Sequence, residues 1–323
     1  SEDDENHDPT HGVAGPRVPG VRSGKGTMCY ANGDMYSGPW HNHERCPTDT
    51  GTMTYANGDE YVGAWIAGGI REGHGILIKA HGRGDKFEGA WKNDQPCGTG
   101  KKVYVNGDSY EGNWGPDGTK KGAGFMAYGN RDRYEGEWDN DLRHGQGTIV
   151  LRSGEKYTGQ WAANLKSGSG ILHLAAGGRI EADFFDDTIV DGEAIMRYAN
   201  GDVYRGQWVN FLRSGTGRME YNNGDTYQGE WFQGCKSGEG TMTLDGSSGD
   251  VYEGQWCLDK KHGQGKLRER NGDEYTGAFE DDTMHGEGEM RYLNGDVHTG
   301  TWKYGGRMKG QGGRSVGKSL FEG

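Results

Sequence analysis

The chain has few of the residues that usually build a protein core. Hydrophobic residues make up only 31% of its 323 residues, and the mean hydropathy is −0.96. No apolar run approaches the roughly 20 residues that a membrane-spanning helix needs. Leucine and isoleucine therefore cannot supply most of a core. The 17 Tyr and 10 Trp can, because each buried aromatic side chain covers on the order of 150–250 Å².

Cysteine and basic charge are also scarce. The five cysteines form no C-x-x-C pair, and their odd number favours reduced thiols in an intracellular compartment over a disulfide framework. The formal net charge is −12 and the isoelectric point is near 5.4, whereas a general nucleic-acid binder has a basic surface. We therefore expect an intracellular protein with no nucleic-acid partner. Whether a presequence preceded Ser1 stays open.

What the chain has in abundance is one repeated motif. An aromatic-x-Gly-x-Trp signature recurs in twelve units spaced by 23 to 26 residues, and every Trp occupies the same position in it. The signature weakens in the last two units, and in the seventh only its frame remains. The repeat predicts a structural ladder of aromatic side chains, formed by Tyr36, Trp40, Tyr61, Trp65, Phe87, Trp91, Tyr110, Trp114, Tyr134, Trp138, Tyr157, Trp161, Tyr204, Trp208, Tyr227, Trp231, Tyr252, Trp256, Tyr275 and Trp302.

Each unit has the pattern of a β-hairpin. In GTMTYANGDEYVGAW, residues 51–65, apolar residues alternate on both sides of an Asn-Gly pair, which is a strong hairpin signal. Side chains alternate faces along a strand, so Tyr61, Gly63 and Trp65 share one face, and Gly63 leaves a gap into which a neighbouring ring can pack. A single hairpin is marginally stable in water, so the units are expected to stack.

The stacked units predict the fold class. The second glycine pair of a unit, such as Gly145 and Gly147, is expected at the return between hairpins, where a positive φ favours glycine. Strands twist relative to their neighbours by roughly 20–25°. We therefore predict an all-β fold, an elongated twisted solenoid of about twelve stacked antiparallel β-hairpins.

The motif resembles a known family. The unit Y-x-G-x-W-x-x-x-x-x-x-G-x-G, seen as YEGEWDNDLRHGQG over residues 134–147, is similar to the MORN repeat (membrane occupation and recognition nexus), and the resemblance extends over about residues 24–312. It implies a MORN-only protein like those of cytoskeletal, ciliary and cortical assemblies. The chain has no room for the kinase, methyltransferase or exchange-factor domain that some MORN proteins carry.

The two ends of the chain lie outside the repeat. Residues 1–20 are acidic, rich in Pro and Gly, and without periodicity, which predicts a disordered arm. Residues 21–312 form the predicted MORN array, one continuous solenoid, and residues 313–323 a tail. GGRSVGKS, residues 312–319, matches the phosphate-loop pattern but lacks the strand before it and the long helix after it. We therefore interpret it as part of a flexible tail.

Candidate metal ligands are spread along the chain. His144, His262 and His285 each precede the first Gly of a G-x-G, but units spaced by roughly 10 Å cannot share an ion whose Zn–N bonds are about 2.0 Å. The Asp after each Asn-Gly pair is too sparse for Ca²⁺, which needs about 6 to 8 oxygens, and is expected to hydrogen-bond its own turn. We predict no metal, no cofactor and no catalytic group, and therefore no enzyme.

One basic column has no role in forming a hairpin. Two residues before the first Gly of the G-x-G stands a Lys or Arg in most units, namely Arg71, Lys120, Arg143, Lys166, Arg213, Lys236 and Lys261. A row of such charges along one edge can bind acidic proteins or anionic lipid headgroups, where each is worth about 1 kcal/mol. A solvated edge, partly neutralised by the acids of the same loops and screened by salt beyond about 10 Å, is the alternative.

The seventh unit departs from the pattern. It carries Ile180, Ala182 and Phe184 where other units have Tyr, Gly and Trp, and Phe185 follows directly. We interpret it either as a bend or partner-contact site that uses Phe184 and Phe185, or as a repeat that has drifted without a new role.

The sequence thus predicts a non-enzymatic scaffold for protein–protein interactions in a large structural assembly. Its open sheet edges favour self-association. The alternative is a membrane-apposed tether that binds anionic phospholipids through the basic column. We expect the protein to be cytoplasmic and associated with the cytoskeleton or a cilium, and an organellar complex stays open.

Overall fold

The computed structural model describes residues 20–46, 49–80 and 84–308, apart from the side chain of Arg307. The chain forms two compact units, residues 1–121 and residues 122–323. The predicted acidic arm except Gly20, and the predicted tail with its phosphate-loop-like segment, lie outside the described residues. A single continuous array over residues 21–312 stays a prediction.

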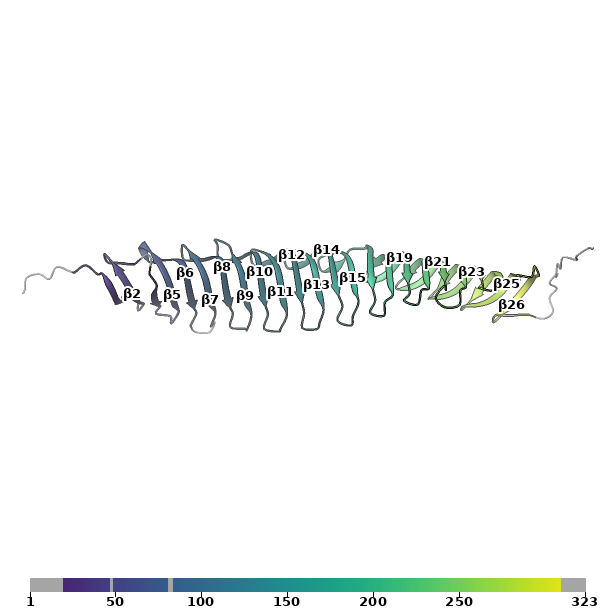
Figure 1. The fold of residues 1–323 in the computed structure, drawn as a ribbon, viewed down its shortest axis with the longest axis horizontal. Coiled ribbons are helices and arrows are strands. Elements are labelled where there is room, and N and C mark those ends of the chain that lie inside the picture. Colours follow the sequence, from purple (N-terminus) through teal and green to yellow (C-terminus); the bar gives the residue numbers. More distant parts are fainter. Residues whose placement is uncertain (1–19, 47–48, 81–83, 309–323) are drawn as a thin grey trace, which may run out of the picture. The chain divides into compact units, whose positions relative to one another are not determined.

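The first unit is an antiparallel β-sheet (Figure 1) whose strands pair in chain order. Its elements are β1 (Gly24–Cys29), β2 (Met35–His41), β3 (Glu44–Arg45), β4 (Gly51–Thr54), β5 (Glu60–Ile66), a 3-10 turn (Ala67–Gly69), β6 (Ile70–Ile78), β7 (Lys86–Lys92), β8 (Gln95–Val103) and β9 (Ser109–Trp114). They form four hairpins in the described residues of this unit.

The second unit repeats the same hairpin eight times in its described residues. Strand β10 (Lys120–Ala127) contains the boundary between the units, and its residues from Gly122 pair with β11. The further strands are β11 (Arg133–Asp139), β12 (Leu142–Val150), β13 (Lys156–Ala162), β14 (Leu165–His173), β15 (Arg179–Phe185), β16 (Thr188–Ile189), β17 (Gly192–Arg197), β18 (Val203–Val209), β19 (Leu212–Glu220), β20 (Thr226–Phe232), β21 (Cys235–Thr243), β22 (Val251–Cys257), β23 (Lys260–Arg268), β24 (Glu274–Glu280), β25 (Thr283–Arg291), β26 (Val297–Lys303) and β27 (Gly306–Arg307). The predicted all-β solenoid of about twelve hairpins is confirmed.

Two kinds of turn alternate along the sheet. At the Asn-Gly pair, the Gly58 N–H donates to Tyr55 O at 2.8 Å, and Gly58 has φ +83°, as in a type I turn followed by a glycine bulge. At the opposite ends of the strands, Asn93 and Asp94 have φ +48° and +66°, the type I′ combination. The sequence analysis predicted only the first kind.

The glycine pair of each unit is not at the return, and that prediction was wrong. Gly145 and Gly147 lie inside β12. Gly145, with φ +57°, occupies a bulge where the register with β11 shifts. At Gly147 a Cβ would lie 2.6 Å from Tyr134 Cζ, so this position is glycine because a ring covers it.

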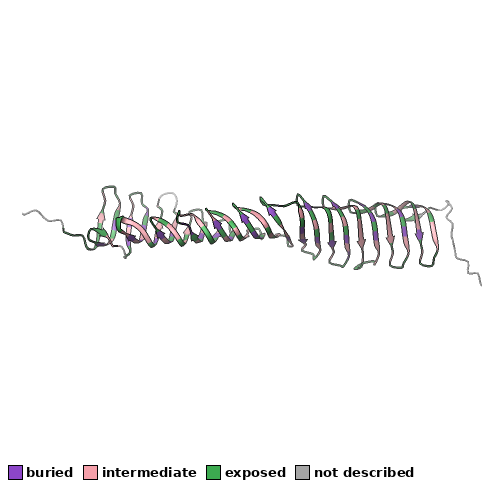
Figure 2. Ribbon diagram, turned by 90° about the horizontal axis from the view of Figure 1, so that it is seen from above, coloured by how far each residue is buried: buried purple, intermediate pink, exposed green. Residues whose placement is uncertain are grey.

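The inner face of each sheet, defined here as the face that carries the Tyr and Trp rings, holds the core. Tyr134 contacts Trp138 of its own strand at a centroid distance of 5.1 Å and Trp161 of the next hairpin at 5.4 Å, both edge to face, which is a favoured geometry worth about 0.5–1.5 kcal/mol for each pair. The polar tip of Tyr134 is satisfied, because its Oη donates to Glu137 O at 3.0 Å. Figure 2 shows these buried positions as bands across the strands of both units.

The gap at each glycine is filled from within the repeat. The Tyr61 ring covers Gly63 of its own strand and Gly75 of the next hairpin. The predicted gap at Gly63 is therefore filled by Tyr61, two residues earlier on the same strand. Its ring lies along the strand because it packs edge to face against the neighbouring Trp rings.

The seventh unit interrupts the ladder. Its return strand is broken into β16 and β17, and Ile180 stands where other units have a tyrosine. The buried Trp208 Nε1 has no hydrogen-bond partner, whereas Trp231 Nε1 donates to Gly217 O at 3.2 Å. The tyrosine ring and the indole hydrogen bond found in neighbouring units are therefore missing at this place in the ladder.

Candidate functional site

The basic column lies over the aromatic ladder. The Arg71 guanidinium is 4.3 Å from the centroid of Trp91, on the other strand of its own hairpin, and 5.5 Å from that of Tyr61 in the preceding hairpin. A cation over an aromatic face is worth about 0.5–2 kcal/mol, depending on desolvation. The column therefore has a structural role that the sequence pattern did not reveal.

The same arrangement recurs at the other predicted column residues. Three of them stack on the Trp of the following strand at 4.2 to 4.5 Å, and three lie 5.5 to 5.7 Å from the Tyr of the preceding strand. The first set is Arg143, Arg213 and Lys236, and the second is Lys120, Lys166 and Lys261. Arg45 also belongs to the column, 4.4 Å from Trp65. Sequence reasoning missed it because extra residues separate it from the next glycine.

The column is also tied to the type I′ turns. The Arg71 N–H and Nε donate to Asp94 Oδ1 at 2.9 and 3.0 Å, and the Lys236 N–H donates to Asp259 Oδ1 at 2.8 Å. Burial lowers the pKa of Lys236, while the Asp259 carboxylate acts in the opposite direction. The Arg71 and Lys166 side chains are 18% and 23% exposed. These charged groups are therefore largely occupied by contacts within the protein.

Three positions in the column carry no base. Pro96, Ile189 and Met284 stand opposite Trp91, Phe184 and Phe279 in the strand register. Isoleucine and methionine are long enough to cover the neighbouring rings. The proline ring is short, and the structure has a cavity there.

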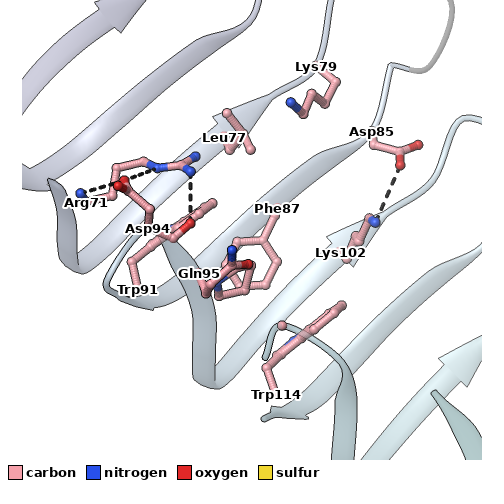
Figure 3. A pocket seen from close by; sticks show the side chains of 12 residues that line it. Arg71, Leu77, Lys79, Asp85, Phe87, Trp91, Asp94, Gln95, Lys102 and Trp114 are labelled. Carbon is pink, nitrogen blue, oxygen red and sulfur yellow. Dashed lines mark hydrogen bonds and ion pairs between the residues drawn. The ribbon is translucent and has the colours of Figure 1, made fainter. Parts of the chain in front are cut away.

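That cavity, which we call the Pro96 cavity, has a volume of about 310 Å³ and lies in the first unit. Its aromatic floor is formed by Phe87, Trp91 and Trp114, and its rim includes Arg71 and Lys102. Figure 3 shows Trp114 at the end of the pocket away from Arg71, with Phe87 and Gln95 between them. The arrangement combines an aromatic floor with a charged rim.

The second unit has a counterpart at the same place in the repeat, which we call the Lys166 cavity. It has a volume of about 210 Å³ and is lined by Arg143, Tyr157, Trp161, Lys166 and Leu172, among others. Lys166 stands where the first unit has Pro96, and its Nζ lies 3.2 Å from Asp187 Oδ1. A lysine in place of the proline thus accompanies the smaller volume.

The opposite face of the second unit, its outer face, exposes apolar side chains. The residue after each Trp points outward, as does its partner across the type I′ turn. There the chain places Leu165, Phe185, Val209, Leu212 and Phe232, with exposed fractions from 37% to 64%. We call these five residues the outer apolar stripe.

The two phenylalanines of the seventh unit lie on different faces. Phe184 is 2% exposed and packs on Tyr157 at 5.1 Å, so it takes the place of a ladder Trp. Phe185 is 64% exposed. Only Phe185 is therefore available to a partner. Alternation along the strand could have separated the two, because neighbouring residues face opposite sides.

Phe211 marks the same region. It has φ +62° and is 49% exposed, at a turn position that other units fill with Asp94, Asn164 or Gly234. A bulky residue is costly in the left-handed region, and such outliers gather at functional sites.

The aspartates of the Asn-Gly turns join neighbouring repeats. The Asp59 N–H donates to Asn57 Oδ1 at 3.0 Å and Asp59 Oδ2 accepts from Asn57 Nδ2 at 3.2 Å, so this aspartate hydrogen-bonds its own turn, as the sequence predicts. Asp59 Oδ1 also accepts the Ala80 N–H of the next hairpin at 3.0 Å, which was not foreseen. The structure contains no cluster of three or more His, Cys, Asp or Glu placed to hold a metal ion within the residues it describes.

The repeat geometry agrees with a sequence comparison. The MORN repeat profile matches eight segments that together cover more than half of the chain, residues 20–35, 87–109, 134–156, 157–179, 204–226, 227–247, 252–274 and 275–297. The chain belongs to the MORN-repeat family. The matched segments leave out residues 180–203 of this MORN protein, where the seventh hairpin departs from the pattern.

Solved structures show only a distant likeness to the MORN protein. The TCP10 domain of Danio rerio CPAP, in complex with a peptide of Danio rerio STIL, is 14% identical, covers 64% of this chain and 90% of that chain, and has a TM-score of 0.37. The SAS-4 (dCPAP) TCP domain of Drosophila melanogaster is 15% identical, with coverages of 70% and 98% and a TM-score of 0.31. At these TM-scores neither likeness bears on fold or function. The comparison with curated proteins gave no match.

Proposed function

We propose that this MORN protein is a non-enzymatic scaffold that binds other proteins within a large cytoskeletal, ciliary or cortical assembly. The observation that carries the proposal is the outer apolar stripe. Monomeric proteins seldom expose large contiguous apolar patches, and such patches are typical of interaction surfaces. Phe185 and Phe232, 64% and 59% exposed, are the aromatic residues of the stripe, and aromatic residues are enriched in binding hot spots.

The charges beside the stripe indicate the chemistry of the partner. A hollow of about 480 Å³ is lined by Glu181, Asp183 and Glu193, together with residues of several neighbouring strands. Glu181 is neutralised by Arg179 and Arg197, at 2.9 and 3.1 Å. We therefore expect a partner segment with apolar side chains and basic flanks.

The basic column gives less support to the lipid tether. Its guanidinium and ammonium groups lie over rings, and several are paired with carboxylates, so binding a headgroup would compete with these contacts. No helix among the described residues has the length and apolar character to cross a membrane. We propose a cytoplasmic protein associated with the cytoskeleton or a cilium, with an organellar complex as the alternative.

Detergent extraction of cells that express the tagged full chain tests this function. We expect the wild-type protein to stay with the insoluble fraction, and the Phe185→Ser/Phe232→Ser variant to be released. Both side chains are exposed, so circular dichroism should show unchanged folding. Lys303→Ser is the matched control, because Lys303 follows its Trp as Phe232 follows Trp231, and it should be retained.

Two results would contradict the scaffold proposal. Equal retention of the double variant would show that the stripe is not the interface. Release of the wild-type protein with the membranes, together with salt-sensitive binding to vesicles of anionic phospholipid that is lost on charge reversal at Arg143 and Arg213, would favour the lipid tether.

A further inference from the structure

The aromatic ladder is built to receive cations. In both units a Lys or Arg of one strand lies over the Trp of the following strand, as Arg71 does over Trp91 at 4.3 Å and Arg213 over Trp231 at 4.2 Å. The arginines also donate Nη2 to a carbonyl of the next turn, as Arg71 does to Asp94 O at 2.9 Å. The ring face and the turn together form a receptor for a guanidinium or ammonium group.

Of the three column positions that carry no base, the one at Pro96 lies at a cavity. Pro96 occupies the column position that precedes Trp114, and among the described residues no Lys or Arg lies over the Trp114 ring. Phe87 and Tyr110 pack against it in edge-to-face geometry at centroid distances of 5.2 and 5.1 Å, and Nε1 donates to Gly100 O at 3.1 Å. The Pro96 cavity of about 310 Å³ opens onto this ring.

The positive groups of the rim are engaged in ion pairs. Arg71 is paired with Asp94 at 3.0 Å, Lys79 with Asp59 at 2.7 Å, and Lys102 with Asp85 at 3.6 Å. Each positive group is thus matched by a carboxylate. Lys102 Nζ also lies over the Tyr104 ring, 4.5 Å from its centroid, and in Figure 3 it points toward Asp85.

We propose that the Pro96 cavity is a binding site for an arginine or lysine side chain of a partner protein. This side chain lies over Trp114, as the chain's own cations lie over other Trp rings of the ladder. The proposal rests on the proposed function only for the source of this side chain, a protein bound to the scaffold. The site lies on the inner face of the first unit, whereas the outer apolar stripe lies on the second unit.

The experiment uses the full chain labelled with fluorotryptophan and observed by fluorine NMR. The Trp114 resonance is assigned from the spectrum of Trp114→Phe. The probes are Nα-acetyl-arginine amide and its neutral isostere Nα-acetyl-citrulline amide. We expect the arginine probe to shift the Trp114 resonance saturably and to bind about five-fold more tightly than the citrulline probe, which corresponds to about 1 kcal/mol.

Two variants localise the effect. Pro96→Arg supplies the missing cation within the chain and should abolish the response of Trp114, whereas Pro96→Ala keeps the vacancy and should preserve it. Arg143→Ala creates the same vacancy in the second unit, so the Trp161 resonance should begin to respond to the arginine probe. That gain keeps the test informative if a change at Pro96 disturbs folding.

Three results would overturn the proposal: no shift of the Trp114 resonance with the arginine probe, equal binding of the arginine and citrulline probes, or an undiminished response in a folded Pro96→Arg variant. Any of them can occur while Phe185→Ser/Phe232→Ser is still released from the insoluble fraction. Failure of this inference is therefore distinguishable from failure of the scaffold function.

Discussion

The Pro96 cavity and the Lys166 cavity occupy the same place in two copies of one hairpin, yet they differ in size and lining. The Pro96 cavity has about 310 Å³, a Phe87 floor and a rim that includes Lys79 and Lys102. The Lys166 cavity has about 210 Å³, a Tyr157 floor, and Leu151 and Leu172 at the corresponding rim positions. The backbone of the repeat is kept while a few side chains change the character of the site.

The difference follows from what proline cannot do. The Lys166 N–H donates to Asp187 Oδ1 at 2.9 Å, and its Nζ reaches the same carboxylate. Proline has no N–H and no cationic side chain, so Pro96 can neither fasten the next turn in this way nor cover the next ring. The cations of the column thus cover the inner face, and at Pro96, where the cation is missing, a cavity opens.

The largest expected effect is alkaline unfolding of the second unit. Burial raises the pKa of Tyr157, Tyr204 and Tyr275 to about 12, while unfolded tyrosine titrates near 10. Their contribution to stability is fully present below pH 10 and is lost as the pH rises to about 12, at up to about 1.4 kcal/mol per residue and pH unit. Circular dichroism against pH checks this.

A matched variant sharpens the alkaline experiment. Phe87 occupies the position of Tyr157 in the first unit and cannot ionise. Tyr157→Phe gives the second unit the same ring, so we expect it to raise the pH at which β-structure is lost. Ionisation of the tyrosines near pH 10, with the β-structure intact, would contradict the prediction.

The next effect comes from filling the glycine beneath each floor ring. A Cβ at Gly170 would lie 2.6 Å from Tyr157 Cζ, and one at Gly100 would lie 2.6 Å from Phe87 Cζ. Tyr157 is anchored by its Oη, which donates to Gln160 O at 3.0 Å. We expect Gly170→Ala to lower stability by about 3 kcal/mol.

Gly100→Ala is the companion measurement. The Phe87 ring has no hydroxyl anchor and can move toward the larger cavity, so the expected loss is about half as large. Urea denaturation of both variants measures the difference. Equal losses would show that the ring's anchor and the cavity space do not matter.

A smaller effect is expected from removing one cation of the column. Arg143 lies 4.4 Å from the Trp161 centroid and donates to Asn164 O at 2.8 Å. Arg143→Ala should therefore cost about 1–2 kcal/mol. Pro96→Ala, at the same position in the first unit, removes no cation and should change stability by less than about 0.5 kcal/mol. Thermal denaturation compares the two, and a large loss for Pro96→Ala would contradict the assignment of the vacancy.

The smallest effect is expected from exchanging the two floor rings. Tyr157→Phe removes one hydrogen bond and should lower stability by about 1 kcal/mol. Phe87→Tyr can gain the corresponding bond to Ala90 O, by analogy with the Tyr61 Oη bond to Ala64 O at 3.2 Å, and should raise stability by about 0.5 kcal/mol. Calorimetric melting temperatures test both signs, and a loss for Phe87→Tyr would mean that this carbonyl is not accessible.

Much of the fold could be predicted because the same sequence pattern recurs in nearly every repeat. Alternation places Tyr61 and Trp65 on one face, and the 23- to 26-residue period sets the hairpin length. The position of Gly145 could not be predicted in this way, since a glycine bulge within a strand and a glycine at a turn carry the same residue signature. The type I′ turns were also missed, because they are formed by varied pairs such as Asn93-Asp94 and Leu258-Asp259.

The candidate site was less predictable than the fold. The sequence indicated the basic column and Phe185 as candidates, but the absence of a base at Pro96 gave no signal by itself. The missing base can be interpreted only once the structure shows that the cations of the column lie over the Trp rings of the following strands, as Lys236 lies over Trp256 at 4.5 Å.

By itself the sequence determined the all-β architecture, the number of hairpins and the identity of the ladder rings, because these follow from local alternation and from a period that repeats along the chain. Only the tertiary structure decided which side chains meet across neighbouring strands and hairpins. The cation over Trp91, the turn carboxylate that fastens Arg71 and the cavity above Trp114 each combine residues about 20 positions apart. Such contacts depend on how neighbouring hairpins pack, and no pattern within a single repeat encodes that.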